Sequence, residues 1–110
     1  IKFLGVALCL LVLITACGNN TERKLLGTWY TEYRAYKFNS DGSFSRKWDW
    51  GLNAGEDDGE GTWELVEDKY LLLQFDSLNT PITIEIKAFS DEHLIGLADN
   101  IEWSFYRTKN

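Results

Sequence analysis

The chain has 110 residues and carries 17 Asp and Glu against 11 Lys and Arg, which gives a net charge of −6 at pH 7. This balance argues against a nucleic acid or an anionic lipid surface as partner, since both require clustered cations. With 45% hydrophobic and 15% aromatic residues, the chain predicts one domain that buries a core of its own.

The first segment is an apolar run from Phe3 to Ala16 that follows a single cation, Lys2. Its 14 residues fit the apolar region of a secretory signal peptide and fall short of a membrane span, which needs roughly 20 residues. The run ends in Ile14-Thr15-Ala16-Cys17, which resembles the lipobox of bacterial lipoproteins, with Ile14 where Leu is usual. The alternative is an ordinary secretory signal followed by a chance cysteine.

The lipobox resemblance implies that residues 1–16 are a signal peptide and that Cys17 becomes the lipidated N-terminus. Two or three acyl chains would anchor it stably, since each buried methylene contributes about 0.8 kcal/mol. Residues 17–24 are then a polar tether and residues 25–110 the folded domain. Loss of Cys9 and lipidation of Cys17 leave that domain without a disulfide. We expect a lipid-anchored protein of the bacterial cell envelope, on the outer membrane facing the periplasm if the source is Gram-negative.

Beyond the tether, short runs of alternating apolar and polar residues are separated by turn residues. Apart from a possible short turn at Thr21–Leu25, no helical periodicity is found. The strongest turn signal is Asp41-Gly42, which supplies the positive φ of a tight hairpin. The alternation predicts eight strands, near residues 26–33, 35–38, 43–50, 60–66, 69–75, 82–89, 93–98 and 101–108.

One face of strand after strand is bulky and apolar. Ile82, Ile84 and Ile86, for example, alternate with polar residues. A meander of this kind, with no helix to cover it, must close on itself or stack as two sheets, and closure also removes exposed edges. The sequence therefore predicts an all-β fold of about eight antiparallel strands closed as a small barrel, preceded by the signal-peptide helix. Tyr70–Leu73 is apolar on both faces, so we expect something to cover its outer side.

Gly27-Thr28-Trp29 opens the first predicted strand and Arg107 lies in the last. With the meander between them, these residues resemble the lipocalin-like fold. The segment around Asp41-Gly42 and the later Gly61-Thr62-Trp63-Glu64 resemble small lipocalin-like lipoproteins of Bacteroidetes. The resemblance covers residues 25–108 and implies that Arg107 packs over Trp29 and closes the barrel through cation–π and hydrogen-bond contacts. The chain is shorter than a lipocalin, and eight strands allow either a filled or a hollow barrel.

The candidate ligand-lining residues are Tyr36, Trp48 and Trp50, next to a Gly-rich loop. Aromatic rings at a barrel mouth would suit an apolar or ring-shaped ligand. Core packing is the competing interpretation, and for Trp48 and Trp50 the two are balanced.

The other candidate sites are less well supported by their residues. Loop 51–60 has four carboxylates that could hold Ca²⁺, but its spacing does not match a calcium-binding loop, so a solvated acidic loop is favoured. His93, the only histidine, reads as an exposed turn residue. Because the chain has no nucleophile elbow, zinc-ligand spacing or phosphate loop, we expect no catalytic activity, metal or cofactor.

Two functions of different kinds follow. The first is a non-catalytic carrier that binds a small apolar or aromatic ligand in the barrel or at its mouth. The second is a protein-interaction or inhibitor module of the envelope, with a filled barrel and an exposed apolar patch near Leu71 and Leu73.

Overall fold

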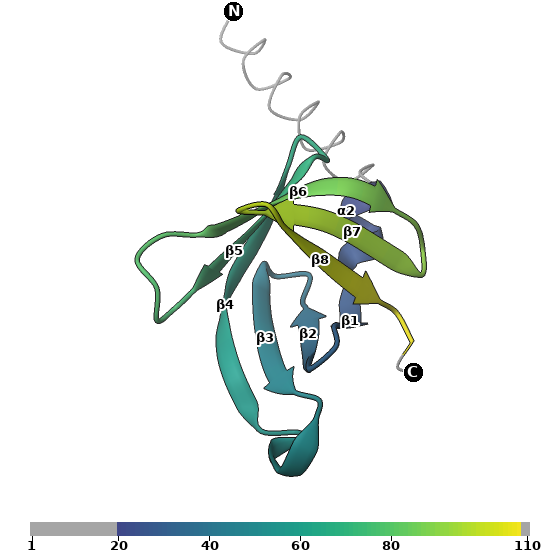
Figure 1. Cartoon of the computed structure of the whole chain (residues 1–110). Coiled ribbons are helices and arrows are strands. Elements are labelled where there is room, and N and C mark those ends of the chain that lie inside the picture. Colours follow the sequence, from purple (N-terminus) through teal and green to yellow (C-terminus); the bar gives the residue numbers. More distant parts are fainter. Residues whose placement is uncertain (1–19, 109–110) are drawn as a thin grey trace, which may run out of the picture.

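Figure 1 shows a computed structural model of the chain, in which residues 20–108 are described. The predicted signal peptide, Cys9, Cys17 and the start of the tether lie outside the described residues. Among residues 20–108, no helix combines the length and the apolar character needed to cross a bilayer.

The described chain has eight strands and almost no helix, which confirms the predicted all-β fold class. Each strand pairs antiparallel with the next, and β8 returns to β1, so the sheet closes as an eight-stranded barrel. Its elements are α2 (Asn20–Leu25), β1 (Gly27–Tyr30), β2 (Arg34–Phe38), β3 (Ser43–Trp48), the 3-10 helix η1 (Gly51–Asn53), β4 (Asp57–Val66), β5 (Tyr70–Phe75), β6 (Ile82–Phe89), β7 (His93–Ala98) and β8 (Ile101–Tyr106).

The strand boundaries differ most from the prediction around the β1–β2 and β3–β4 connections. β1 ends at Tyr30, because the Thr31 amide donates to the Arg34 carbonyl at 2.8 Å and closes a tight turn. β4 begins at Asp57, because pairing with β3 continues to Lys47. The predicted loop 51–60 is therefore shorter, and its last residues are part of the sheet.

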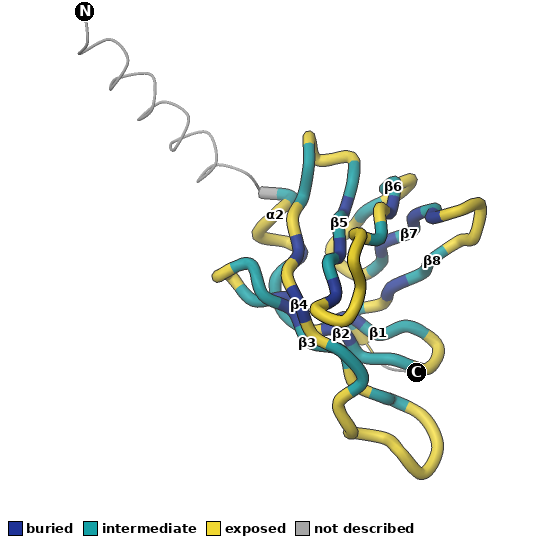
Figure 2. Tube along the Cα trace, turned by 90° about the vertical axis from the view of Figure 1, so that its left-hand side faces the viewer, coloured by how far each residue is buried: buried dark blue, intermediate teal, exposed yellow. Residues whose placement is uncertain are grey.

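The barrel has two different ends. At the helix end lie α2 and the turns 39–42, 67–69 and 90–92. At the open end lie the connections 31–33, 49–56, 76–81 and 99–100. Figure 2 shows that the loop after β3 is exposed along most of its length, whereas most buried residues lie in the strands.

The β2–β3 hairpin at the helix end shows how the turn chemistry works. Gly42 has a φ of +90°, a conformation that favours glycine. The Asp41 carboxylate accepts hydrogen bonds from the Ser43 amide (2.9 Å) and hydroxyl (2.6 Å). These bonds hold the pKa of Asp41 below its ordinary value. The Asp-Gly pair thus fixes the register that turns Phe38 and Phe44 inward.

Aromatic rings fill much of the barrel interior. Tyr36 stacks near Phe38 and Phe44, with ring centroids 6.2 and 6.5 Å apart, and Phe44 meets the Phe75 ring edge-on at 5.0 Å. Glycine makes this packing possible where strands approach closely. A Cβ on Gly61 would lie 1.9 Å from the Gln74 carbonyl oxygen. The sequence allowed either a filled or a hollow barrel. Within the described residues, the core is filled with side chains.

The exposed apolar patch expected of an interaction module near Leu71 and Leu73 does not form. Both side chains point into the core and are 1% and 0% exposed, because strand alternation places them on the inner face of β5. The residues on the outer face of that strand, Tyr70 and Leu72, are half-buried.

Candidate functional site

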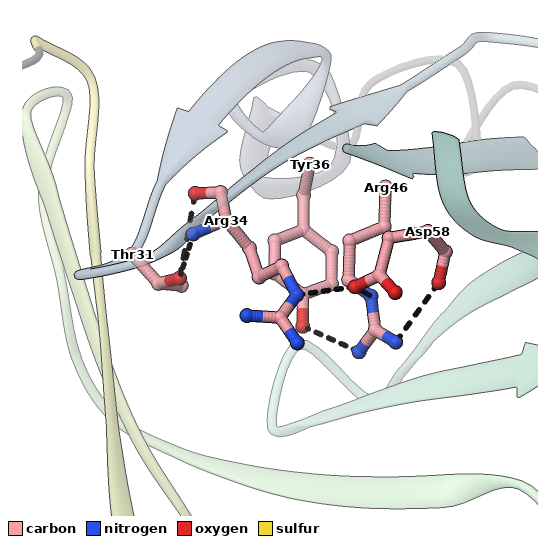
Figure 3. Close-up of polar contacts among 5 residues, drawn as sticks. All are labelled: Thr31, Arg34, Tyr36, Arg46 and Asp58. Atoms are coloured by element: carbon pink, nitrogen blue, oxygen red, sulfur yellow. Dashed lines mark hydrogen bonds and ion pairs between the residues drawn. The ribbon is translucent and has the colours of Figure 1, made fainter. Parts of the chain in front are cut away.

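A charged cluster lies just inside the open end of the barrel. Arg34 comes from β2, Arg46 from β3 and Asp58 from β4 (Figure 3). The β3–β4 register steps from Arg46–Gly59 to Lys47–Asp57, so Asp58 is the extra residue of a β-bulge. A bulge re-aims side chains, and here the carboxylate meets both arginines.

Hydrogen bonds tie the cluster together. Asp58 Oδ2 accepts from Arg34 Nε and lies 3.1 Å from Arg46 Nε. Arg46 Nη2 donates to the Asp58 carbonyl at 3.0 Å, and Nη1 donates to the Tyr36 hydroxyl at 3.4 Å. In Figure 3, the interactions drawn use only Nε of the Arg34 guanidinium. Two cations thus share one carboxylate.

Aromatic rings surround the same guanidinium groups. Arg34 Cζ lies 3.3 Å from the centroid of the Trp48 ring, and Arg46 Cζ lies 4.5 Å from that of Phe75. Such stacking orients a planar guanidinium and adds cation–π attraction. Burial raises the pKa of Tyr36, so its phenol stays neutral at physiological pH. Because two guanidinium groups pair with one carboxylate, the cluster fixes the positions of these three charged side chains.

A cleft of about 880 Å³ opens beside this cluster. Its walls come from residues 30–34 and Tyr36, from Asp49 and Trp50 after β3, and from β8 with Thr108. The Asp49 amide donates to the Tyr33 carbonyl at 2.8 Å and holds the loop against the β1–β2 turn. The rings of Tyr33 and Trp50 then meet edge-on, with centroids 5.3 Å apart.

The cleft exists because β1 is too short to pair with all of β8. Tyr30 and Tyr106 form the single residue pair between these strands. In the β7–β8 ladder, the pairing of Ala98 with Ile101 determines which residues of β8 direct their backbone N–H and C=O groups toward β7. The backbone groups of Glu102 and Ser104 therefore point to the other edge, toward the cleft. An unpaired strand edge and a cavity thus occur together.

Large apolar side chains gather around the cleft. Among the described residues, six large hydrophobic side chains are exposed, and four of them line this cavity: Tyr33, Trp50, Ile101 and Tyr106. Trp50 and Ile101 are each 64% exposed. The half-buried Trp103 completes the aromatic lining. Exposed apolar residues are ordinary when scattered, whereas a group around one concave surface indicates a binding site.

Two of the three predicted ligand-lining residues line the cleft, and the third does not. Tyr36 and Trp50 lie in the wall of the cleft, although Tyr36 is only 2% exposed. Trp48 is not among the lining residues; its ring is covered by the Arg34 guanidinium.

The predicted closure pair lies at the opposite end of the barrel. Arg107 Cζ lies 4.1 Å from the Trp29 ring centroid, and its Nη atoms donate to the carbonyls of Thr28 (3.3 Å) and Lys24. Trp29 Nε1 donates to the Leu25 carbonyl at 2.9 Å, and both Trp29 and Leu25 are fully buried. The helix end is therefore sealed by α2, an indole and a guanidinium.

The other sequence candidates do not converge on a site. Within residues 20–108, no group of three or more His, Cys, Asp or Glu side chains could hold a metal ion. His93 is half-buried and stacks on Tyr106 with ring centroids 4.3 Å apart, in place of the exposed turn position predicted for it. The strand start buries it because Tyr106 is its partner across the β7–β8 ladder.

Sequence reasoning missed Arg34, Arg46, Asp58, Tyr33 and Trp103 as site residues. A signal for the arginines was present, since Arg34 and Arg46 share the inner-face parity of Tyr36 and Phe44. Cations on an apolar face call for an internal counter-ion. Asp58 carried no such signal, because strict alternation does not predict which residue a bulge turns inward.

Comparison with protein-family models, with curated protein sequences and with solved structures found no significant match to this chain. The class that the fold defines is a closed eight-stranded antiparallel β-barrel. That architecture is consistent with a lipocalin-like fold.

Proposed function

We propose that this protein is a non-catalytic binding module that takes a small apolar or aromatic ligand into the cleft at the open end of its barrel. The observation that carries the proposal is the gathering of Tyr33, Trp50, Ile101 and Tyr106 around one cavity of about 880 Å³. That volume is in the range of small-molecule sites, which are mostly apolar with a few fixed polar groups. Arg34 and Tyr36 supply such groups in this wall.

The location in the cell belongs to the same proposal. The lipobox-like residues ending at Cys17 support a lipid-anchored protein of the bacterial envelope, of the small lipocalin-like type found in Bacteroidetes. On this view α2, which contains the last residues of the predicted tether, lies at the sealed end, and the cleft opens at the other end of the barrel.

A fluorescence titration with single-ring aromatic and short apolar molecules tests the ligand-binding proposal. We expect a saturable change in tryptophan emission, and we expect Trp50→Ala to weaken binding roughly fivefold, since one aromatic contact contributes on the order of 1 kcal/mol. Leu52→Ala is the matched control, because Leu52 is exposed in the neighbouring η1 and is not among the lining residues. Saturable binding that Trp50→Ala leaves unchanged would place the ligand elsewhere.

The second candidate function is a protein-interaction or inhibitor module of the envelope. The observation that favours it is the edge of β8 at Glu102 and Ser104, whose backbone groups face the cleft beyond the single pair with β1. A partner strand could pair there by β-augmentation. A ligand screen without saturable binding would favour this function over the first.

A further inference from the structure

We infer that the ligand of the cleft is a cation with an apolar or aromatic body, such as a substituted ammonium compound. This inference rests on the proposed ligand-binding function and adds the charge of the ligand. It follows from the mainly negative side chains that line the cleft and from the exposed aromatic rings beside them.

The charges of the lining are mainly negative. Glu32, Asp49 and Glu102 contribute three carboxylates, and Arg34 is the only cation of the described lining. Arg34 is already paired with Asp58 and stacked on Trp48. An anionic ligand would meet a guanidinium whose charge Asp58 already balances, and it would have to approach past the carboxylates of the lining. A cation meets an attractive field, which the net charge of the whole chain reinforces.

The rings at the rim match the same ligand. Tyr33 and Trp50 are both exposed and meet edge-on, so ring surface from two connections faces solvent at one place. Aromatic faces attract cations through their quadrupole, and Trp is the strongest of the side chains that do so. Glu32 precedes Tyr33 in the turn, and hydrogen bonding to Glu32 raises the pKa of the Tyr33 phenol, which stays neutral.

The charged end and the apolar body of the ligand then bind to different parts of the cleft. The cation lies against Tyr33 and Trp50, near Glu32, where solvent still reaches it. The apolar body extends along β8 toward Ile101 and Trp103, which form the opposite wall.

The test compares three molecules of similar size on the full chain: benzyltrimethylammonium, its neutral carbon isostere neopentylbenzene, and phenylacetate. Calorimetry and tryptophan fluorescence should show the cation binding about tenfold more tightly than the neutral isostere, as cation–π contact and nearby carboxylates imply. Added salt should weaken cation binding and leave the isostere unaffected. The anion should bind most weakly.

Charge-removing variants locate the effect. Glu32→Gln combined with Glu102→Gln should lower cation affinity about three- to tenfold and leave the isostere unchanged. Glu64→Gln, an exposed strand residue of β4 outside the cleft, is the matched control and should change neither. Equal binding of cation and isostere, or preference for phenylacetate, would overturn the charge assignment while leaving the cleft as a ligand site. Absence of binding by all three would overturn both.

Discussion

At the scale of single residues, the open end depends on one carboxylate. Asp58 faces two arginines and forms an ion pair with each of them. Its place comes from the β-bulge, which strand alternation alone does not predict. The arginines themselves could be anticipated, because both fall on the inner face of their strands.

We predict that Asp58→Asn lowers the free energy of unfolding by about 1–3 kcal/mol. Two half-buried guanidinium groups would then face each other without a counter-charge, and partial exposure to solvent moderates the cost. Denaturant titration measures the change, and Asp57→Asn at the exposed neighbouring position is the control. A loss below about 0.5 kcal/mol would show that the cluster does not depend on this charge.

At the sealed end of the barrel, we predict that stability depends on Trp29. Its fully buried indole is bonded to Leu25 and covered by Arg107, so Trp29→Ala should cost about 3–5 kcal/mol, as large aromatic truncations do. Thermal or denaturant unfolding checks the value, with Trp50→Ala as an exposed comparison. Were the Trp29 variant to lose less than about 1 kcal/mol, the closure role would be wrong.

At the scale of elements, close strand approach depends on glycine. Gly61 is buried in β4 opposite Phe75, and an added Cβ would meet the backbone of Gln74, which cannot move aside as a flexible side chain could.

Gly61→Ala should therefore destabilise the barrel by at least about 2 kcal/mol, since overpacking of this kind shifts backbone. The adjacent exposed Thr62→Ala should change stability far less, and the two unfolding curves provide the comparison. An equal effect of both substitutions would contradict the proposed β4–β5 contact.

Element order was predictable because alternation and turn residues are local signals. The eight strands lie close to the predicted ranges, and the Asp41-Gly42 hairpin forms where its turn chemistry requires. The end of β1 and the start of β4 were not predictable, since the first is set by hydrogen bonding in a turn and the second by a bulge in the β3–β4 ladder, neither of which residue alternation predicts. The cleft was beyond sequence reasoning for the same reason: it arises from the mismatch between the lengths of β1 and β8.

At the scale of the whole molecule, the barrel has one end sealed by α2, Trp29 and Arg107 and another that bears a cleft. The lipobox-like Cys17 precedes the sealed end in the chain. Barrel closure was predictable from an apolar face in strand after strand, whereas the filled interior was not, because it depends on how the inward-facing rings pack.

We predict that Cys17→Ala releases the protein from membranes, because the acyl chains would be its anchor. Fractionation of cells followed by immunoblotting compares the variant with the parent chain. Cys9→Ala, which lies within the predicted signal peptide, is the control and should leave membrane attachment intact. Persistence of the Cys17 variant in the membrane fraction would count against lipidation.

The most direct measurement of the central claim is amide chemical-shift mapping by two-dimensional NMR during titration with small aromatic ligands. The cleft predicts saturable shifts concentrated at residues 30–34, 49–50 and 101–104, with little change at the sealed end around Trp29 and Arg107. Shifts centred on another surface, or no saturable shift from any ligand of the panel, would contradict a ligand-binding role for the cleft.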